Sequence, residues 1–158
     1  LAARHVLEAD ITIVCMGPGV AGTATPFGFS GMELADNLNR VFSLQGKAVV
    51  LPRISFADAR PRHRGLSHHT ITALKHAVLV PVDLPLPVLQ PEEQQLLQEQ
   101  IETHQIDKKH SLFFYDNLTL AHLIADEQLC KTMGHTLSED PAFFLAAVAA
   151  AKHLTTLC

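Results

Sequence analysis

The segment that decides the predicted fold is ITIVCMGPGVAGTAT, residues 11–25. Its first six residues form an apolar run that is typical of a buried strand. A glycine-rich loop follows directly. Such a loop lets backbone N–H groups approach an anionic ligand, because glycine has no Cβ to keep the ligand away. The segment therefore predicts a strand followed by a ligand-binding loop, as in an α/β protein that binds a small molecule.

The composition is that of a globular domain. The chain has 158 residues, 47% of them hydrophobic and 18% charged, and its formal net charge is −4. We expect one α/β domain over residues 1–158 and, since the chain does not begin with Met, a fragment of a longer protein. Three cysteines without paired spacing favour a reducing, cytoplasmic location over a disulfide-stabilised secreted one.

The same features limit the partners. A mildly negative chain does not attract a nucleic-acid backbone or an anionic membrane surface, so we expect no nucleic acid and no membrane as partners. The longest apolar run, 141–151, is shorter than the roughly 20 residues that a membrane-spanning helix needs. A helix that is apolar almost all round must be covered on more than one side. We therefore expect a homo-oligomer, or packing of this last helix against a missing N-terminal part.

The order of the predicted elements indicates the fold class. Apolar runs that predict strands alternate with segments that predict helices, and this order is typical of parallel crossovers. The runs are continuous rather than alternating, as expected for strands buried on both faces. We predict a Rossmann-like three-layer sandwich with a mainly parallel sheet of four or five strands. The predicted strands are 11–16, 48–51, 78–82, 112–115 and a weaker one at 130–133.

The predicted ligand site lies at the carboxyl edge of this sheet, where open parallel sheets bind ligands. There the glycine-rich loop meets the segment 53–69, which contains four of the six arginines and three of the ten histidines in the chain. Such a concentration of cations predicts a small anionic ligand with a phosphate or carboxylate group. The residues predicted to bind it are Gly17, Gly19, Gly22, Thr23 and Thr25 in the first loop and Arg53, Arg62 and Arg64 in the second.

The histidines of the same segment predict proton transfer. A histidine among arginines can act as a general acid or base near neutral pH. We predict that His63 or His68 moves a proton in a hydrolytic or transfer reaction, and that Asp58 orients that histidine. We predict no metal site, because His68 and His69 would point about 100° apart on a helix. The sequence does not identify a cofactor.

Two other functions stay open. Residues 17–22 match G-x-G-x-x-G after a predicted strand, and Arg53 stands where an NADP-binding protein would bind the 2′-phosphate. An NADP-dependent oxidoreductase is therefore one alternative. The other is a non-catalytic assembly or regulatory module that uses the apolar last helix as its interface.

Several motifs together resemble an uncharacterised bacterial family of unknown function. They are GPGVAGT at 17–23, GFSG at 28–31, PRISFAD at 52–58, RHRGLSHHT at 62–70 and TMG at 132–134. The resemblance runs from Asp10 to Ala150. It implies that this chain is a C-terminal part of a longer protein, and it favours a bacterial, cytoplasmic protein without supplying a mechanism.

Overall fold

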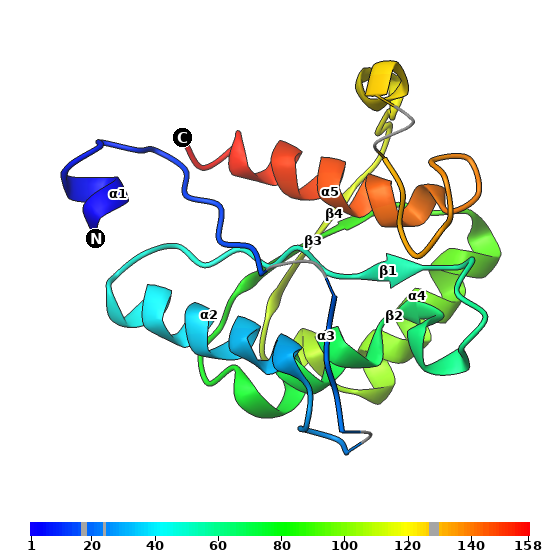
Figure 1. Ribbon diagram of the computed structural model, residues 1–158, viewed down its shortest axis with the longest axis horizontal. Coiled ribbons are helices and arrows are strands. Elements are labelled where there is room, and N and C mark those ends of the chain that lie inside the picture. The colour runs from blue at the N-terminus through cyan, green and yellow to red at the C-terminus, as the bar shows by residue number, and fades with distance from the viewer. Residues whose placement is uncertain (17–18, 24, 127–129) are drawn as a thin grey trace.

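The computed structural model describes residues 1–16, 19–23, 25–126 and 130–158. Its α-helices are α1 (Ala2–His5), α2 (Glu33–Ser43), α3 (His68–Thr72), α4 (Pro91–Thr103) and α5 (Pro141–Leu154) (Figure 1). Its strands are β1 (Ile54–Ser55), β2 (Gly65–Leu66), β3 (Asp83–Pro87) and β4 (Ser111–Tyr115). Shorter helical segments are η1 (Ser30–Met32), η2 (Pro61–His63), η3 (Ala73–Ala77, a π-helix), η4 (Ile106–Lys108) and η5 (Ala121–Asp126).

The strands form two small sheets. β3 and β4 pair in parallel, with Asp83 opposite Ser111, and β1 and β2 pair antiparallel. One further parallel bridge joins Val49 to Asp83. The fold is therefore a mixed α/β fold, and the prediction of a Rossmann-like sandwich with four or five strands is wrong. The predicted strand 112–115 is confirmed as β4, and it pairs in parallel as predicted. Its partner is β3 at 83–87, whereas the predicted strand 78–82 is not a strand in the structure.

Prolines explain why the predicted second strand does not extend the sheet. The backbone N–H and C=O of Asp83 both bond to the 48–50 segment, to Ala48 O at 3.0 Å and from Val50 N at 2.9 Å. Alternate residues of a parallel strand bond to the same neighbour, so Pro85 and Pro87 face that segment too. Proline has no N–H to donate, and the ladder ends after one bridge.

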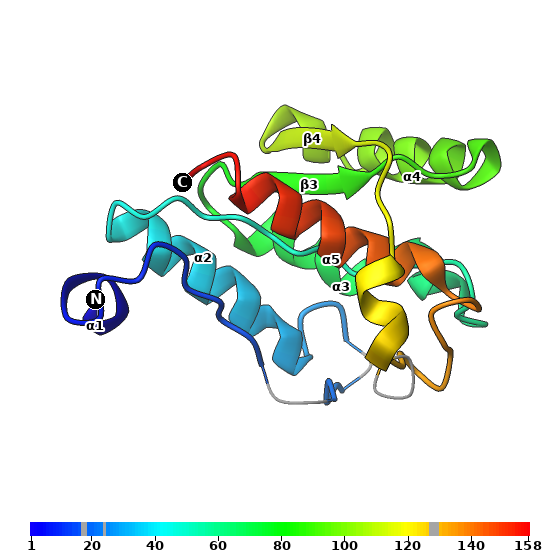
Figure 2. The same ribbon diagram turned by 90° about the horizontal axis from the view of Figure 1, so that it is seen from above.

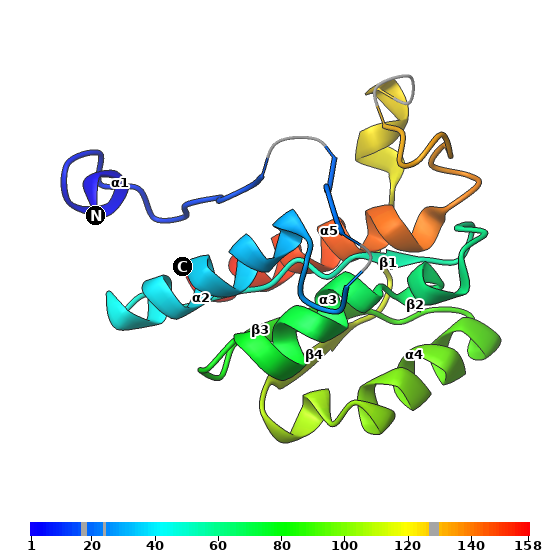
Figure 3. The ribbon, with the colours of Figure 1, turned by 60° about the horizontal axis from the view of Figure 1, so that its bottom comes forward.

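Two other predicted strands are also absent from the described residues. Residues 11–16 are extended but unpaired, and Ile13 is 81% exposed. Figure 3 shows this segment running apart from β3 and β4, so its apolar run has no neighbour to pair with. Near 130–133, Thr132 and His135 close a tight turn. Met133 and Gly134 in this turn both have positive φ, at 50° and 89°, which is incompatible with a strand.

The predicted last helix, 141–151, is confirmed as α5, and the core lies between the helices and the β3–β4 sheet. α5 packs on β3, every residue of which is buried, and runs alongside it in Figure 2. α4 lies on the other side of this sheet (Figure 3). Burial against β3, β1 and β4 accounts for much of the apolar character of α5. No helix in the described part of the chain is long and apolar enough to span a membrane. All three cysteines are unpaired.

Candidate functional site

The arginine-rich segment, predicted as a loop, folds into a hairpin. β1 and β2 pair with Ile54 opposite Leu66, and η2 lies between them. Gly65 has φ of +72°, a conformation that other residues rarely adopt. The Gln100 side chain of α4 fixes the returning strand: its Oε1 accepts from Leu66 N at 2.7 Å, and its Nε2 donates to Arg64 O at 3.0 Å. The hairpin therefore has a defined position against α4.

Three histidines come together at the end of this hairpin. His63 ends η2, and His68 and His69 begin α3. Their ring centroids are 4.7 Å (His63–His68), 5.0 Å (His63–His69) and 4.1 Å (His68–His69) apart. One ring nitrogen from each lies within 4.8 Å of the other two. We call these three residues the histidine cluster. The prediction that adjacent rings on α3 would diverge is wrong, and with it the reason for predicting no metal there.

Ser67 is the central hydrogen-bonding group of the cluster. This fully buried residue caps α3: its Oγ accepts from His69 N at 3.4 Å and bonds to His63 Nδ1 at 2.9 Å. His68 Nε2 is buried and has no hydrogen-bond partner. His63 is therefore oriented by Ser67, whereas we predicted that Asp58 would orient it.

Asp58 instead forms ion pairs with two arginines, Arg53 and Arg60. Its carboxylate accepts from Arg60 Nε at 3.0 Å and Nη2 at 2.8 Å, and from Arg53 Nη2 at 3.2 Å. The hydrogen bonds from Arg60 hold the pKa of Asp58 far below its usual range, against the opposing effect of burial. The second terminal nitrogen of Arg53, Nη1, is buried without a partner. The carboxylate is thus ionised, and one guanidinium donor beside it is unsatisfied.

Backbone pairing places Arg53 at the cluster. Its C=O accepts from Ser67 N at 2.9 Å, and its N–H donates to Thr70 Oγ1 at 3.2 Å. Arg62 is exposed and is the charge that most lowers the pKa of His68. Arg64 acts on Glu93 of α4, and it is not among the charges that shift the cluster's pKa values. The histidine–arginine site therefore consists of the histidine cluster with Arg53, Arg60 and Arg62.

Burial and these arginines keep the cluster neutral at neutral pH. Burial, followed by Arg60 and Arg53, lowers the pKa of His63 to about 4. Burial and the neighbouring His68 lower that of His69 to about 4, and burial with Arg62 lowers that of His68. All three rings therefore offer a lone pair at neutral pH, in a field of positive charge.

The glycine-rich loop reaches the site through one aromatic ring. Phe29 stacks on His69, with ring centroids 4.2 Å apart and planes 18° apart. An antiparallel bridge joins Gly22 to Phe29. A Cβ on Gly31 would lie 2.9 Å from Phe29 Cε2, so glycine there leaves room for the ring. The loop is thus a neighbour of the cluster.

In the described residues of this loop, the hydroxyl groups predicted to bind an anion are bonded within the loop itself. The hydroxyls of Thr23 and Thr25 bond to each other at 3.0 Å, and the Thr23 hydroxyl also donates to Gly28 O at 3.2 Å. Gly19 is exposed, with φ of +89°, and Gly17 lies outside the described residues. No strand precedes the loop in the described residues, and α2 begins only at Glu33. The geometry thus gives the NADP alternative no support.

Several contributors were not predicted as site residues. They are His69, Arg60, Ser67 and Phe29, which the hairpin and the Gly22–Phe29 bridge bring to the cluster. Asp140 is a further one: its carboxylate accepts from Ser55 Oγ at 2.5 Å and from Phe56 N at 3.1 Å. It thereby ties α5 to the hairpin, and its side chain makes no cap hydrogen bond to α5. The only local signals were the Ser67 cap and the recurrence of histidine at 63, 68 and 69.

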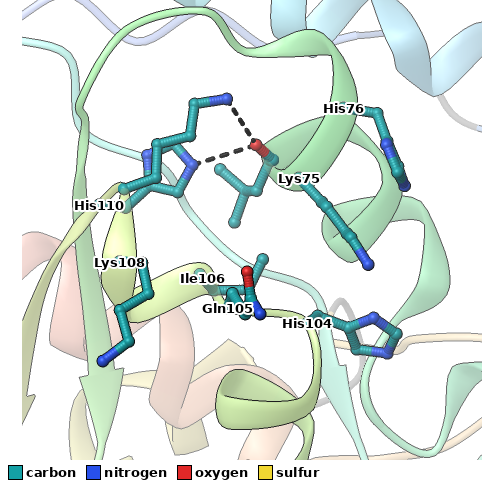
Figure 4. Close-up of a pocket in the computed structure, with 9 residues that line it drawn as sticks. Lys75, His76, His104, Gln105, Ile106, Lys108 and His110 are labelled. Carbon is teal, nitrogen blue, oxygen red and sulfur yellow. Dashed lines mark hydrogen bonds between the residues drawn. The ribbon is translucent and has the colours of Figure 1, made fainter.

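A second basic cavity, of about 300 Å³, lies between η3 and the segment after α4. Lys75 and His76 come from η3, while His104, Lys108 and His110 come from the facing segment (Figure 4). Lys109 Nζ and His110 Nε2 both bond to the carbonyl oxygen of Leu74, the latter at 3.1 Å. Lys109 and His110 are thus bonded to the backbone of η3. The lysines of this cavity that could bind a ligand are Lys75 and Lys108.

Comparison with known proteins identifies a family. A family model described as "Protein of unknown function (DUF3866)" matches residues 1–151, which include the whole histidine–arginine site. No curated protein and no solved structure matches the chain. The predicted resemblance to a family of unknown function is confirmed. The bacterial origin and the C-terminal position within a longer protein stay predictions.

Proposed function

The chain belongs to this family of unknown function, and we propose that it binds a small molecule with a phosphate or carboxylate group at the histidine–arginine site. Hydrolytic or transfer chemistry on the bound molecule is the reaction class that we propose. We expect this activity in the cytoplasm, since the cysteines are unpaired.

One observation carries the proposal: Arg53 Nη1 is buried and has no acceptor. A buried guanidinium N–H without an acceptor costs free energy, and a carboxylate or phosphate oxygen is the acceptor that best matches its geometry. Ser67 N donates to the C=O of Arg53 at 2.9 Å, and the charge of Arg53 lowers the pKa of all three histidines. An anion bound by this nitrogen would therefore lie near the histidine cluster.

Unbalanced charge supports the same site. Segment 53–64 has four arginines and one carboxylate, Asp58, which binds Arg53 and Arg60. Arg62 is exposed, and its positive charge acts directly on His68. An incoming anion would relieve the repulsion among these cations, which act at short range in a partly desolvated site.

Phosphate binding by the full chain tests the proposal. Isothermal titration with inorganic phosphate is compared for the wild type, Arg62→Ala and Arg64→Ala, two variants that each remove one positive charge from the same loop. We expect Arg62→Ala to weaken binding by roughly 10-fold to 100-fold, as for the loss of one charge-assisted hydrogen bond. We expect Arg64→Ala, whose charge faces α4, to bind almost as the wild type does.

Equal phosphate affinity in the wild type and Arg62→Ala would overturn this assignment. Loss of affinity in Lys75→Ala instead would place the anion in the second basic cavity. The proposed chemistry is tested with a p-nitrophenyl phosphate ester and a p-nitrophenyl carboxylate ester. We expect turnover of at least one to be lost in His68→Gln and kept in His122→Ala, an exposed histidine on η5. If neither ester is turned over, the proposed chemistry is wrong and only the proposed binding of an anion is left.

A further inference from the structure

Three histidine rings whose candidate ligand nitrogens lie within 4.8 Å of one another form a ligand set for a transition metal. We propose that His63, His68 and His69 bind a divalent ion of the Zn²⁺ type and leave one coordination position open toward Arg53. The metal site stands on its own geometry. Only the role of the open position rests on the proposed function, as the place where the anion would complete the coordination.

The spacing of the ring nitrogens fits such an ion after small side-chain rotations. The three candidate ligand atoms lie within 4.8 Å of one another. Zinc–nitrogen bonds of 2.0–2.1 Å in a tetrahedral site put ligand nitrogens about 3.3 Å apart. The backbone around the ligands is held in place by the β1–β2 pairing and by the Ser67 cap. Three histidines with an open fourth position are the ligand set of catalytic rather than structural zinc sites.

The hydrogen bonds of the cluster point to the same occupant. His68 Nε2 is buried and unpartnered, although buried polar atoms are nearly always satisfied. His63 Nδ1 is bonded to Ser67 Oγ at 2.9 Å, which leaves Nε2 of that ring for a metal. Ligating histidines commonly use their second nitrogen in this way, since the bond fixes the ring's orientation and tautomer. A bound ion would give His68 Nε2 a partner. It would also bind His63 in the orientation that the hydrogen bond from Ser67 already fixes.

The positive charge of the surrounding arginines repels a dication, so the affinity for the metal should depend on a bound anion. Asp58 neutralises part of the charge of Arg53 and Arg60, while Arg62 is not among the residues that form ion pairs in the described chain. An anion in the open position would cancel the remaining repulsion. Each ligand should therefore raise the affinity for the other by the same factor, and Arg62→Ala should tighten metal binding while it weakens phosphate binding.

Titration of the full chain with Co²⁺ alone tests the proposal, because tetrahedral Co²⁺ absorbs intensely in the visible range. We expect this absorption in the wild type and in His122→Ala. We expect His68→Gln and His69→Gln, which replace a ligand by a side chain of similar length, to lower the Co²⁺ affinity by more than about 100-fold, the upper end of the effect of outer-shell partners. Circular dichroism verifies that these variants are folded.

Two results would overturn the metal site. One is the absence of tetrahedral Co²⁺ absorption, together with no heat of Zn²⁺ binding, in folded wild-type protein. The other is Co²⁺ binding by His68→Gln that equals that of the wild type. Because no anion is present, a negative result leaves the phosphate titration intact. Failure of the phosphate titration likewise leaves the Co²⁺ result intact, so the two proposals fail separately.

Discussion

The Ser67 hydroxyl is the smallest group on which the histidine–arginine site depends. It caps α3 and bonds to His63, so it fixes both the helix start and one ring of the cluster. We expect Ser67→Ala to lower the free energy of unfolding by at least about 1 kcal/mol, the typical effect of losing an N-cap. The additional loss of the His63 bond should increase this effect.

Urea denaturation of Ser67→Ala measures this loss. Ser43→Ala is the matched control, because Ser43 is exposed and its hydroxyl only donates to Asn39 O within α2. The control should change the free energy of unfolding by less than Ser67→Ala does. Equal effects of the two substitutions would show that the Ser67 hydroxyl has no special role.

Protonation of the cluster gives a prediction for pH. The pKa of His63 and that of His69 are lowered from 6.5 to about 4 in the folded chain. Between these values the unfolded chain binds more protons, so stability rises with pH. We expect the free energy of unfolding of the metal-free protein to fall as the pH drops from 7 to 5.

Urea titrations at pH 7 and pH 5 check this dependence. His69→Gln should show a smaller decrease between these pH values, since it lacks one of the rings whose pKa is lowered in the folded chain. Asp58 does not interfere, because its ordinary pKa of 3.8 and its lower folded pKa both lie below this window. A wild-type stability that stays constant or increases toward pH 5 would contradict the predicted shifts.

At the scale of elements, the β1–β2 hairpin depends on Gly65 and Gln100. Gly65 has positive φ, and the Gln100 side chain occupies the space where a Cβ would lie. Gly65→Ala should therefore combine backbone strain, about 1–2 kcal/mol for a left-handed residue, with displacement of Gln100 from the hairpin backbone. We expect a lower melting temperature and weaker phosphate binding.

Gly134→Ala separates the two effects of the Gly65 substitution. Gly134 also has positive φ, at +89°, but a Cβ at this position would have no other atom within 4 Å. Thermal unfolding should show a smaller decrease in melting temperature for Gly134→Ala than for Gly65→Ala. The same decrease in both variants would mean that Gln100 does not support the hairpin.

Local signals predicted most of the helices but not the sheet. Pro91 with acidic residues in the first turn predicts α4, and the apolar run after Pro141 predicts α5, as observed. The sheet depends on which backbone groups find a partner. Pro85 and Pro87 cannot donate to the 48–50 segment, and residues 11–16 have no neighbouring strand. A run of apolar residues carries no information on either point.

The sequence indicates which residues gather in the candidate site but not how they are arranged. The concentration of arginines and histidines between 53 and 69 was visible in the sequence. Their arrangement depends on pairing within the hairpin, which brings His63 to α3 and turns Arg64 toward α4. The role of the glycine-rich loop depends on the Gly22–Phe29 bridge, a contact that no motif indicates.

At the scale of the whole molecule, the interface predicted on α5 stays a prediction. Phe144 of α5 is only 7% exposed, so an acidic residue in its place would put a charge inside the fold and would not test an interface alone. Ala147 lies on the same helix and is exposed. Sedimentation therefore compares the oligomeric state of the wild type with that of Ala147→Arg.

The most direct test of the central claim follows the histidine side chains by ¹H–¹⁵N NMR while phosphate is added to the full chain. The ten histidines include the histidine cluster and the three rings of the second basic cavity, His76, His104 and His110. We predict that phosphate shifts the ring signals of His68 and His69 and leaves those of the second cavity unchanged. Shifts confined to His76, His104 and His110 would contradict the assignment of the site.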